Sequence, residues 1–295
     1  MLVTPLFALW LSAATVLPKN QILIKGAEPA ASDSSTALPE QGRVVEGRYL
    51  NDYFGLSYPV PAGWREQPSG PPPSDSGSYV LAQFALFGPD GKRVLAHVLV
   101  TAQDLFFSAR PVASAGELTR AFAANLAPEY AVERAPADVT IAGRPFTRFG
   151  YGAAAAGLHW RMLSTDARCH ALTFTLTGSS DVALDAAERA LSGITFGSDA
   201  EVPRCVAFYA FDHVMSREEP HFSVRRFNTM PVRVVIGSDG LVKHVHVLAA
   251  FPEQSQAILT ALRAWRFQPY LQDGKALPVE TGIVFGSVRP ASPSH

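Results

Sequence analysis

Apolar residues alternate with polar ones, or recur every three to four positions, along most of residues 44–200. Helical spacing of Leu118, Phe122 and Leu126 predicts one helix at 114–126, and a second helix is predicted after Asp181. Because strands, helix, strands and helix follow one another, we expect an α+β fold with an antiparallel sheet covered by two helices on one face. The predicted strands are residues 53–58, 79–87, 93–102, 132–141, 146–151, 158–164 and 170–176.

A second pattern follows a break at residues 197–203. Val232, Val234 and Ile236 alternate with other residues, which is typical of a strand with one buried face. A turn and a second strand follow, and then a helix that ends before Pro269, because proline cannot continue it. We therefore expect a small ββαβ domain with elements at residues 230–236, 241–248, 252–265 and 277–285.

The chain length of 295 residues exceeds the usual size of one hydrophobic core, so two domains are expected. A stretch rich in Ala, Ser, Pro and Glu separates the amino-terminal end from the first periodic pattern, and we interpret it as a linker. The expected division is a signal-peptide-like segment at 1–17, the linker at 18–43, domains at 44–200 and 206–288, and a tail at 289–295.

The apolar run at residues 6–17 is too short to span a bilayer about 30 Å thick as a helix, but it fits the hydrophobic part of a signal peptide. Small residues around Ala14 supply a cleavage site. The first basic residue, Lys19, follows the run instead of preceding it, so a buried strand is the alternative. We expect export, which makes the protein periplasmic or secreted.

The formal net charge is -1 and 17% of the residues are charged. A protein that binds nucleic acid gains most of its affinity by neutralising phosphates with an excess of basic residues. This chain has no such excess, so we expect no nucleic-acid partner.

The chain has two cysteines, Cys169 and Cys205. In an oxidising compartment the pair is expected to form one disulfide, which would stabilise the fold by about 3 to 4 kcal/mol. The alternative is two separate buried thiols, since free cysteine packs well in protein cores.

His244 and His246 lie two positions apart on a predicted strand, so both imidazoles share one face. Zinc sites bring three or four ligands, and the sequence nominates no third one beyond the remote His221. We therefore expect a solvated strand face and no metal.

Other motifs also fail to support catalysis. The glycines at 150 and 152 lack the third glycine and the helix of a dinucleotide-binding loop. Asp181, Asp185 and Glu188 follow one flank of the second helix, where acidic residues stabilise a helix start. We expect a protein without a cofactor and without enzymatic activity; the alternative is an enzyme whose site the sequence does not reveal.

The start of the first domain carries a recognisable motif. Residues 47–56 read GRYLNDYFGL, and Pro61, Gly63 and Trp64 follow. This resembles the opening of PsbP-like α/β domains, and the closing helix with Ile194 and Phe196 fits their end. The resemblance implies a non-catalytic binding or assembly module.

The second domain resembles the C-terminal domain of the TonB energy transducers. The residues that carry this resemblance are VRVVIGSDG at 232–240 and AWRFQP at 264–269, followed by Gly274 and the last strand. The Tyr-Pro pair usual before the first strand is absent, and a folded domain stands where TonB proteins have a long proline-rich spacer.

The TonB resemblance implies a binding mode in which an extended peptide adds to a sheet edge. The expected edge is the last strand, at Thr281, Gly282, Ile283, Val284 and Phe285. We therefore expect a cell-envelope adaptor that recognises a protein or peptide partner. The alternative is a ligand-binding or assembly accessory acting through the PsbP-like domain.

Overall fold

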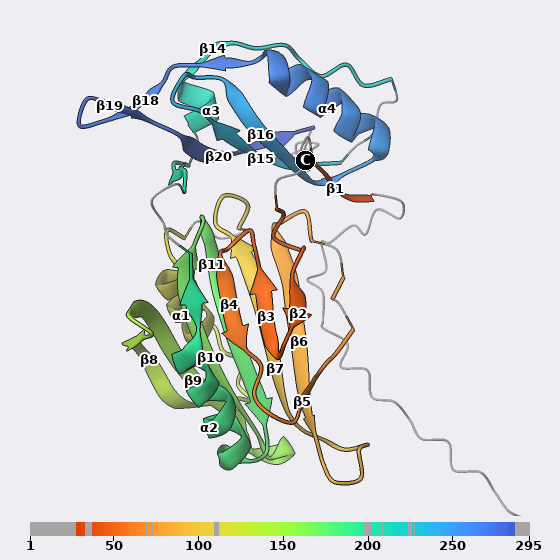
Figure 1. Cartoon of the computed structure of the whole chain (residues 1–295), viewed down its shortest axis with the longest axis vertical. Coiled ribbons are helices and arrows are strands. Elements are labelled where there is room, and N and C mark those ends of the chain that lie inside the picture. Colours follow the sequence, from red (N-terminus) through yellow and green to blue (C-terminus); the bar gives the residue numbers. More distant parts are fainter. Residues whose placement is uncertain are drawn as a thin grey trace, which may run out of the picture.

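The computed structural model describes residues 28–32, 37–68, 70–71, 73–108, 112–197, 202–207, 209–223, 226 and 228–286 (Figure 1). The segment 1–17, where a signal peptide is expected, lies outside the described residues, as do linker residues 18–27 and 33–36 and the tail 289–295. Within the described ranges, no helix is long and apolar enough to cross a membrane.

The N-terminal region, residues 37–197, contains a seven-stranded antiparallel sheet in the order β5-β6-β7-β11-β10-β9-β8. Helix α1 (Ala115–Ala124) carries the chain from β7 to the far edge at β8, and the Ser114 side chain caps it by accepting from the Glu117 amide. The strands are β5 (Trp64–Glu66), β6 (Ser78–Phe87), β7 (Val94–Asp104), β8 (Ala131–Ile141), β9 (Arg144–Ala153), β10 (Leu158–Ala167) and β11 (His170–Gly178).

The two helices lie on opposite faces of this sheet. Leu184 of helix α2 (Asp181–Ala190) belongs to the main core, which includes Phe146 of β9. Phe122 of α1 instead contacts Phe149 and Tyr151, which point to the other face of β9. The expectation of two helices on one face is therefore wrong, because a second sheet occupies most of the α2 face.

This second sheet has four strands in the order β12-β4-β3-β2, and β4, β3 and β2 lie side by side in Figure 1. Its residues Tyr49 and Tyr58 belong to the main core. One strand was expected at 53–58, but the chain turns at 52–55, where Gly55 adopts a positive φ of 58°. The strands are β2 (Arg43–Val45), β3 (Arg48–Asn51), β4 (Leu56–Pro59) and β12 (Thr195–Phe196), the last following a short 3₁₀ turn at Leu191–Gly193.

The C-terminal region, residues 202–286, is a sheet covered on one face by helix α4 (Pro252–Ala264). Val232, Val234 and Ile236 of β15 (Met230–Ile236) face α4, as their alternation predicts. Strand β16 (Val242–Ala250) pairs with one side of β15 and β20 (Val279–Phe285) with the other. The smaller elements are β13 (Arg204–Cys205), α3 (Tyr209–Asp212), β14 (Val214–Ser216), β17 (Arg266–Phe267), β18 (Tyr270–Gln272) and β19 (Lys275–Leu277).

Part of the expected linker is a strand. Strand β1 (Glu28–Ser32) pairs antiparallel with the outer side of β16, so the C-terminal sheet has the order β1-β16-β15-β20-β13. Strand pairing uses backbone groups, so a stretch without hydrophobic periodicity can still add to a sheet edge.

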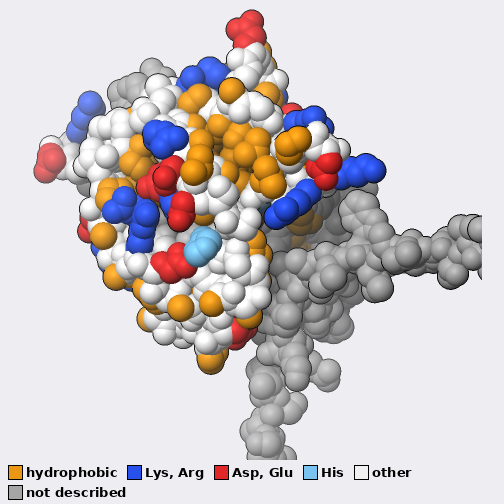
Figure 2. Space-filling model, turned by 90° about the horizontal axis from the view of Figure 1, so that it is seen from below, with side chains coloured by type: hydrophobic (Ala, Val, Ile, Leu, Met, Phe, Trp, Pro, Cys, Tyr) orange, Lys and Arg blue, Asp and Glu red, His pale blue; other side chains and the backbone are white. Residues whose placement is uncertain are grey.

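The C-terminal region lies across one end of the N-terminal sheet, where β7 ends and β11 begins (Figure 1). The strand register places Val94 and Val132 at the opposite end, where β11 also ends and α2 begins with Val182 in its first turn; the three valines are 51%, 53% and 76% exposed. Seen from that end, hydrophobic side chains gather in one area with Lys and Arg side chains around it (Figure 2). The end that meets the C-terminal region is instead polar, buried and cross-linked.

Candidate functional site

Arg233 joins the two regions. Its neighbours in β15 point to α4, so alternation sends Arg233 through the other face of the sheet toward the N-terminal region, where only 2% of it is exposed. Nη1 pairs with the Asp104 carboxylate at the end of β7. Nη2 lies 2.9 Å from Glu280 Oε1 of β20. One buried guanidinium therefore bridges carboxylates from both regions.

Further hydrogen bonds hold these two carboxylates. The Tyr53 hydroxyl donates to Glu280 Oε1 at 3.1 Å, and the Phe106 amide donates to Asp104 Oδ1 at 2.8 Å. Burial raises the pKa of Asp104, and the Arg233 charge opposes that shift. Two of these contacts, Arg233 with Asp104 and Tyr53 with Glu280, join the two regions, so each buried carboxylate is compensated in part by a residue of the other region.

His170 lies beside this pair, fully buried among the rings of Tyr53, Phe54 and Tyr79. Its Nδ1 is 2.7 Å from the Arg168 carbonyl oxygen, which assigns the proton to Nδ1. Nε2 then presents a lone pair to the Arg233 guanidinium at 3.5 Å. Burial, together with the nearby positive charge of Arg233, lowers the pKa of His170 well below its ordinary value, so the ring is neutral.

A disulfide links the two regions at the same place. Cys169 in the turn between β10 and β11 is bonded to Cys205 of β13, with 5.5 Å between their Cα atoms. Arg168 and Cys169 both have positive φ, 44° and 62°, as the central positions of a tight hairpin turn of this type require. Cys205 also pairs with Glu280, so the cross-link attaches the N-terminal region directly to the edge of β20.

A small cavity of about 40 Å³ lies between the regions, next to this network. His246 lines it and is 7% exposed, with Nε2 3.6 Å from Glu40 Oε1, so the expected solvated strand face is wrong for this histidine. Neither ring nitrogen of His246 has a hydrogen-bond partner among the described residues. The cavity is large enough to hold a water molecule, although apolar atoms form most of its lining. Across the described ranges, no three His, Cys, Asp or Glu residues converge as metal ligands.

The expected partner-binding strand, β20, is paired on one side along its whole length. Each residue from Val279 to Phe285 lies opposite a residue of β15. On the other side, β13 covers only Val279 and Glu280, where the Val206 amide donates to the Glu280 carbonyl oxygen at 3.1 Å. The part of β20 beyond Glu280 therefore has a strand on one side only within the described structure.

Backbone alternation identifies which groups face this open side. Because the Glu280 carbonyl points to β13, the N–H and C=O groups of Gly282 and Val284 point the same way. Pro231, which has no N–H, lies opposite Val284, and this fits the assignment. No hydrogen bond within the described ranges reaches these outward groups. Val284 is 49% exposed.

The N-terminal region closes over the face of the sheet next to this edge. A Cβ at Gly282 would lie 2.8 Å from Phe106 Cβ and 2.9 Å from the Phe107 ring, so only glycine allows this approach. Ile283 points the other way, into the α4 core, and is 4% exposed. The site is therefore the outer backbone edge of β20. One face of this strand is buried under α4, and the other lies against the N-terminal region.

The sequence predicts the strand at residues 277–285 but not the buried network around Arg233 that lies beside it. A signal for Arg233 exists, because it is the one charged side chain of its strand and alternation points it away from Val232 and Val234. Asp104 ends its strand and carries no such signal. The pairing of these residues depends on how the two regions meet, which no local pattern encodes.

Comparisons with known proteins concern each region separately. Residues 225–286, which span β15 to β20, match the family model of the Gram-negative bacterial TonB protein C-terminal. The solution structure of cyanobacterial PsbP (CyanoP) from Synechocystis sp. PCC 6803 matches with a TM-score of 0.37 and 14% identity, covering 51% of this chain and 91% of that one. The motifs at 232–240 and 264–269 lie within the residues that match the TonB family model. A search of curated proteins finds no match.

Proposed function

We propose that this protein is a non-catalytic adaptor of the cell envelope that binds an extended segment of a protein partner at the open edge of β20. The observation that carries the proposal is the pair of outward backbone positions, Gly282 and Val284, beyond the end of β13. A partner strand could pair with these groups and gain main-chain hydrogen bonds.

The match of residues 225–286 to the TonB C-terminal family supports this mode and a setting in the envelope. The apolar run at 6–17 and the disulfide both suit an exported protein. We further propose that the N-terminal and C-terminal regions act as two domains in a fixed orientation. The Arg233 ion pairs and the disulfide would then fix the position of one domain relative to the other.

Site-specific photocrosslinking tests the proposal in living cells. A photoreactive amino acid replaces Val284 in the full chain, expressed in a Gram-negative bacterium, and adducts with envelope proteins are identified by mass spectrometry. The matched control is the same replacement at Val182, which is 76% exposed but lies at the far end of the N-terminal region. The proposal predicts a defined adduct from position 284 and none of that mass from position 182. Equal adducts from both positions, or none from position 284, would contradict it.

Deletion of the C-terminal region is a poorer test. It would remove both Arg233 and Cys205, so Asp104 would lose its ion pair and Cys169 its disulfide partner, and the N-terminal region would change as well. A single replacement at the exposed Val284 avoids this difficulty.

A further inference from the structure

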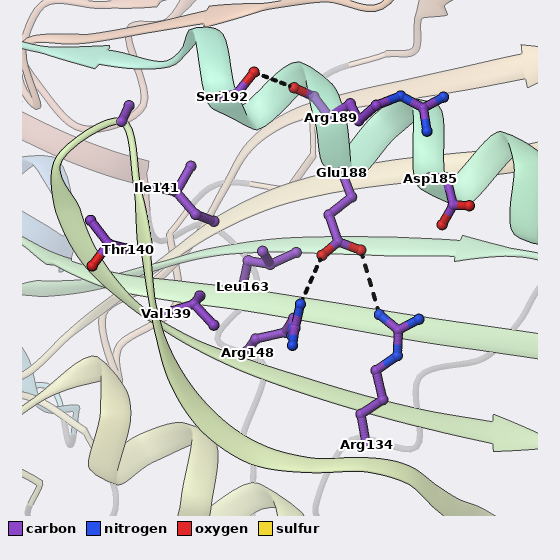
Figure 3. A pocket seen from close by; sticks show the side chains of 11 residues that line it. Arg134, Val139, Thr140, Ile141, Arg148, Leu163, Asp185, Glu188, Arg189 and Ser192 are labelled. Carbon is purple, nitrogen blue, oxygen red and sulfur yellow. Dashed lines mark hydrogen bonds and ion pairs between the residues drawn. The ribbon is translucent and has the colours of Figure 1, made fainter.

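A second pocket lies in the N-terminal region, between α2 and the outer strands β8 and β9 (Figure 3). Its volume is about 440 Å³, within the range of roughly 300 to 1,000 Å³ typical of small-molecule sites. Val139 and Ile141 of β8 form an apolar wall, and the buried Leu163 of β10 lies behind it in the core. Arg134 and Arg148 extend from the strands toward Glu188 of α2 on the other side (Figure 3).

The acidic residues of α2 are already engaged by a different arginine. Arg161 is 6% exposed, and its guanidinium hydrogen-bonds to Asp181 at 3.0 Å, to Asp185 at 2.5 Å and to Glu188 Oε2 at 3.0 Å. The hydrogen bond from Arg161 lowers the pKa of Asp185, so that carboxylate stays ionised. These acids were expected only to stabilise the helix start, but they also neutralise Arg161.

Arg134 and Arg148 are left with weak pairing. Their Nη1 atoms lie 3.8 and 3.6 Å from the oxygens of Glu188, longer than a hydrogen bond of about 2.7 to 3.2 Å. Glu188 is thus shared by three guanidinium groups. Arg189 of α2 also lines the pocket, so four arginines (134, 148, 161 and 189) lie among three carboxylates (181, 185 and 188), and the cluster has a net charge of +1. The side chains of Arg134 and Arg148 are 47% and 37% exposed and can reach a ligand.

We propose that this pocket binds a small amphiphilic anion, a carboxylate or sulfonate attached to a short apolar chain or ring. The acid group accepts hydrogen bonds from Arg134 and Arg148, whose planar guanidinium groups suit a two-oxygen acceptor. The apolar part lies against Val139 and Ile141. The pocket shares no residue with the edge of β20, so this site is independent of the proposed partner binding.

Three probes separate the contributions of charge and apolar contact: octanoate carries both, 1-octanol only the chain, and acetate only the charge. Each is titrated into the ¹⁵N-labelled full chain and followed by amide chemical shifts. Octanoate should shift amides of residues 139–142 and 163 and bind at least tenfold more tightly than either other probe. Equal affinity for octanoate and 1-octanol, or shifts confined to other residues, would overturn the proposal.

Variants complete the test. The double variant R134Q/R148Q should lose at least tenfold in octanoate affinity while its affinity for 1-octanol stays within twofold. The control R217Q removes an arginine that is 58% exposed and pairs with Glu219 outside the pocket, and it should bind octanoate as the parent chain does. Unchanged octanoate binding in R134Q/R148Q would contradict the site. Photocrosslinking from position 284 should be the same in R134Q/R148Q, so either proposal can fail alone.

Discussion

Replacing Arg233 by methionine should strongly destabilise the protein. Methionine fills a similar volume but leaves the buried Asp104 and Glu280 without their shared counter-charge. Removing one partner of a buried ion pair costs about 3 to 5 kcal/mol, mainly because the remaining charge is desolvated and uncompensated. With a urea dependence of about 2 kcal/mol per molar, the unfolding midpoint should fall by about 1.5 to 2.5 M.

The assay is urea unfolding of the full, oxidised chain, followed by far-ultraviolet circular dichroism at pH 7.5. The control R217M removes the exposed pair with Glu219 and should cost less than about 1 kcal/mol. A triple variant, R233M/D104N/E280Q, removes all three charges. Its amide oxygens can still accept from the Phe106 amide and the Tyr53 hydroxyl, so it should recover at least half of the stability lost in R233M.

Two results would refute this reasoning. A loss below about 1 kcal/mol in R233M would mean that Asp104 and Glu280 do not depend on Arg233 in the folded protein. A triple variant no more stable than R233M would mean that the loss reflects packing and not uncompensated charge.

Two other perturbations act on the same junction. The double variant C169A/C205A removes the disulfide, which spans a sequence separation of 36, and should cost about 4 kcal/mol of stability in the chain-entropy model. Reducing the disulfide of the parent chain with a phosphine should lower the unfolding midpoint by the same amount. A loss in only one of the two experiments would contradict a stabilising disulfide. Stability should also fall as the pH drops below about 6.5, because His170 then binds a proton in the unfolded chain but stays neutral in the folded one. The free energy of unfolding should change by up to about 1.4 kcal/mol per pH unit from His170. His97, whose pKa is also lowered by burial, contributes in the same direction. H170N should reduce this slope between pH 5.5 and 7, whereas an unchanged slope would show that His170 is not its source.

Local patterns in the sequence predict most of the regular elements. The helix expected at 252–265 is α4, Pro252–Ala264, because its apolar residues recur at helical spacing and Pro269 follows. The strands expected around Val232 and Val234 form for the same kind of reason, with one face buried under α4. These elements depend on the spacing of apolar residues within a short segment, and that spacing can be read from the sequence.

What the sequence misses depends on contacts between distant segments. Strand β1 pairs with β16 through backbone groups, which requires no alternation of apolar and polar residues, so its sequence does not mark it as a strand. Helix α1 lies on the face of the large sheet opposite α2, because the sheet of β2, β3, β4 and β12 covers most of the face on which α2 packs. Asp104 and Arg233 are 129 positions apart, and only the docked arrangement makes one the counter-ion of the other.

The central claim is that a partner pairs with the open backbone edge of β20, and a proline at position 284 tests it most directly. V284P removes an N–H that the described structure leaves unused, and proline is tolerated at strand edges, so folding should be preserved. V284T keeps the N–H and serves as the control. The measurement is the dissociation constant of each purified chain for the segment captured by crosslinking at position 284. The account predicts binding by V284T within twofold of the parent chain and binding by V284P at least about fivefold weaker, since a partner carbonyl loses its donor. Equal affinity of V284P and V284T would contradict pairing at this edge.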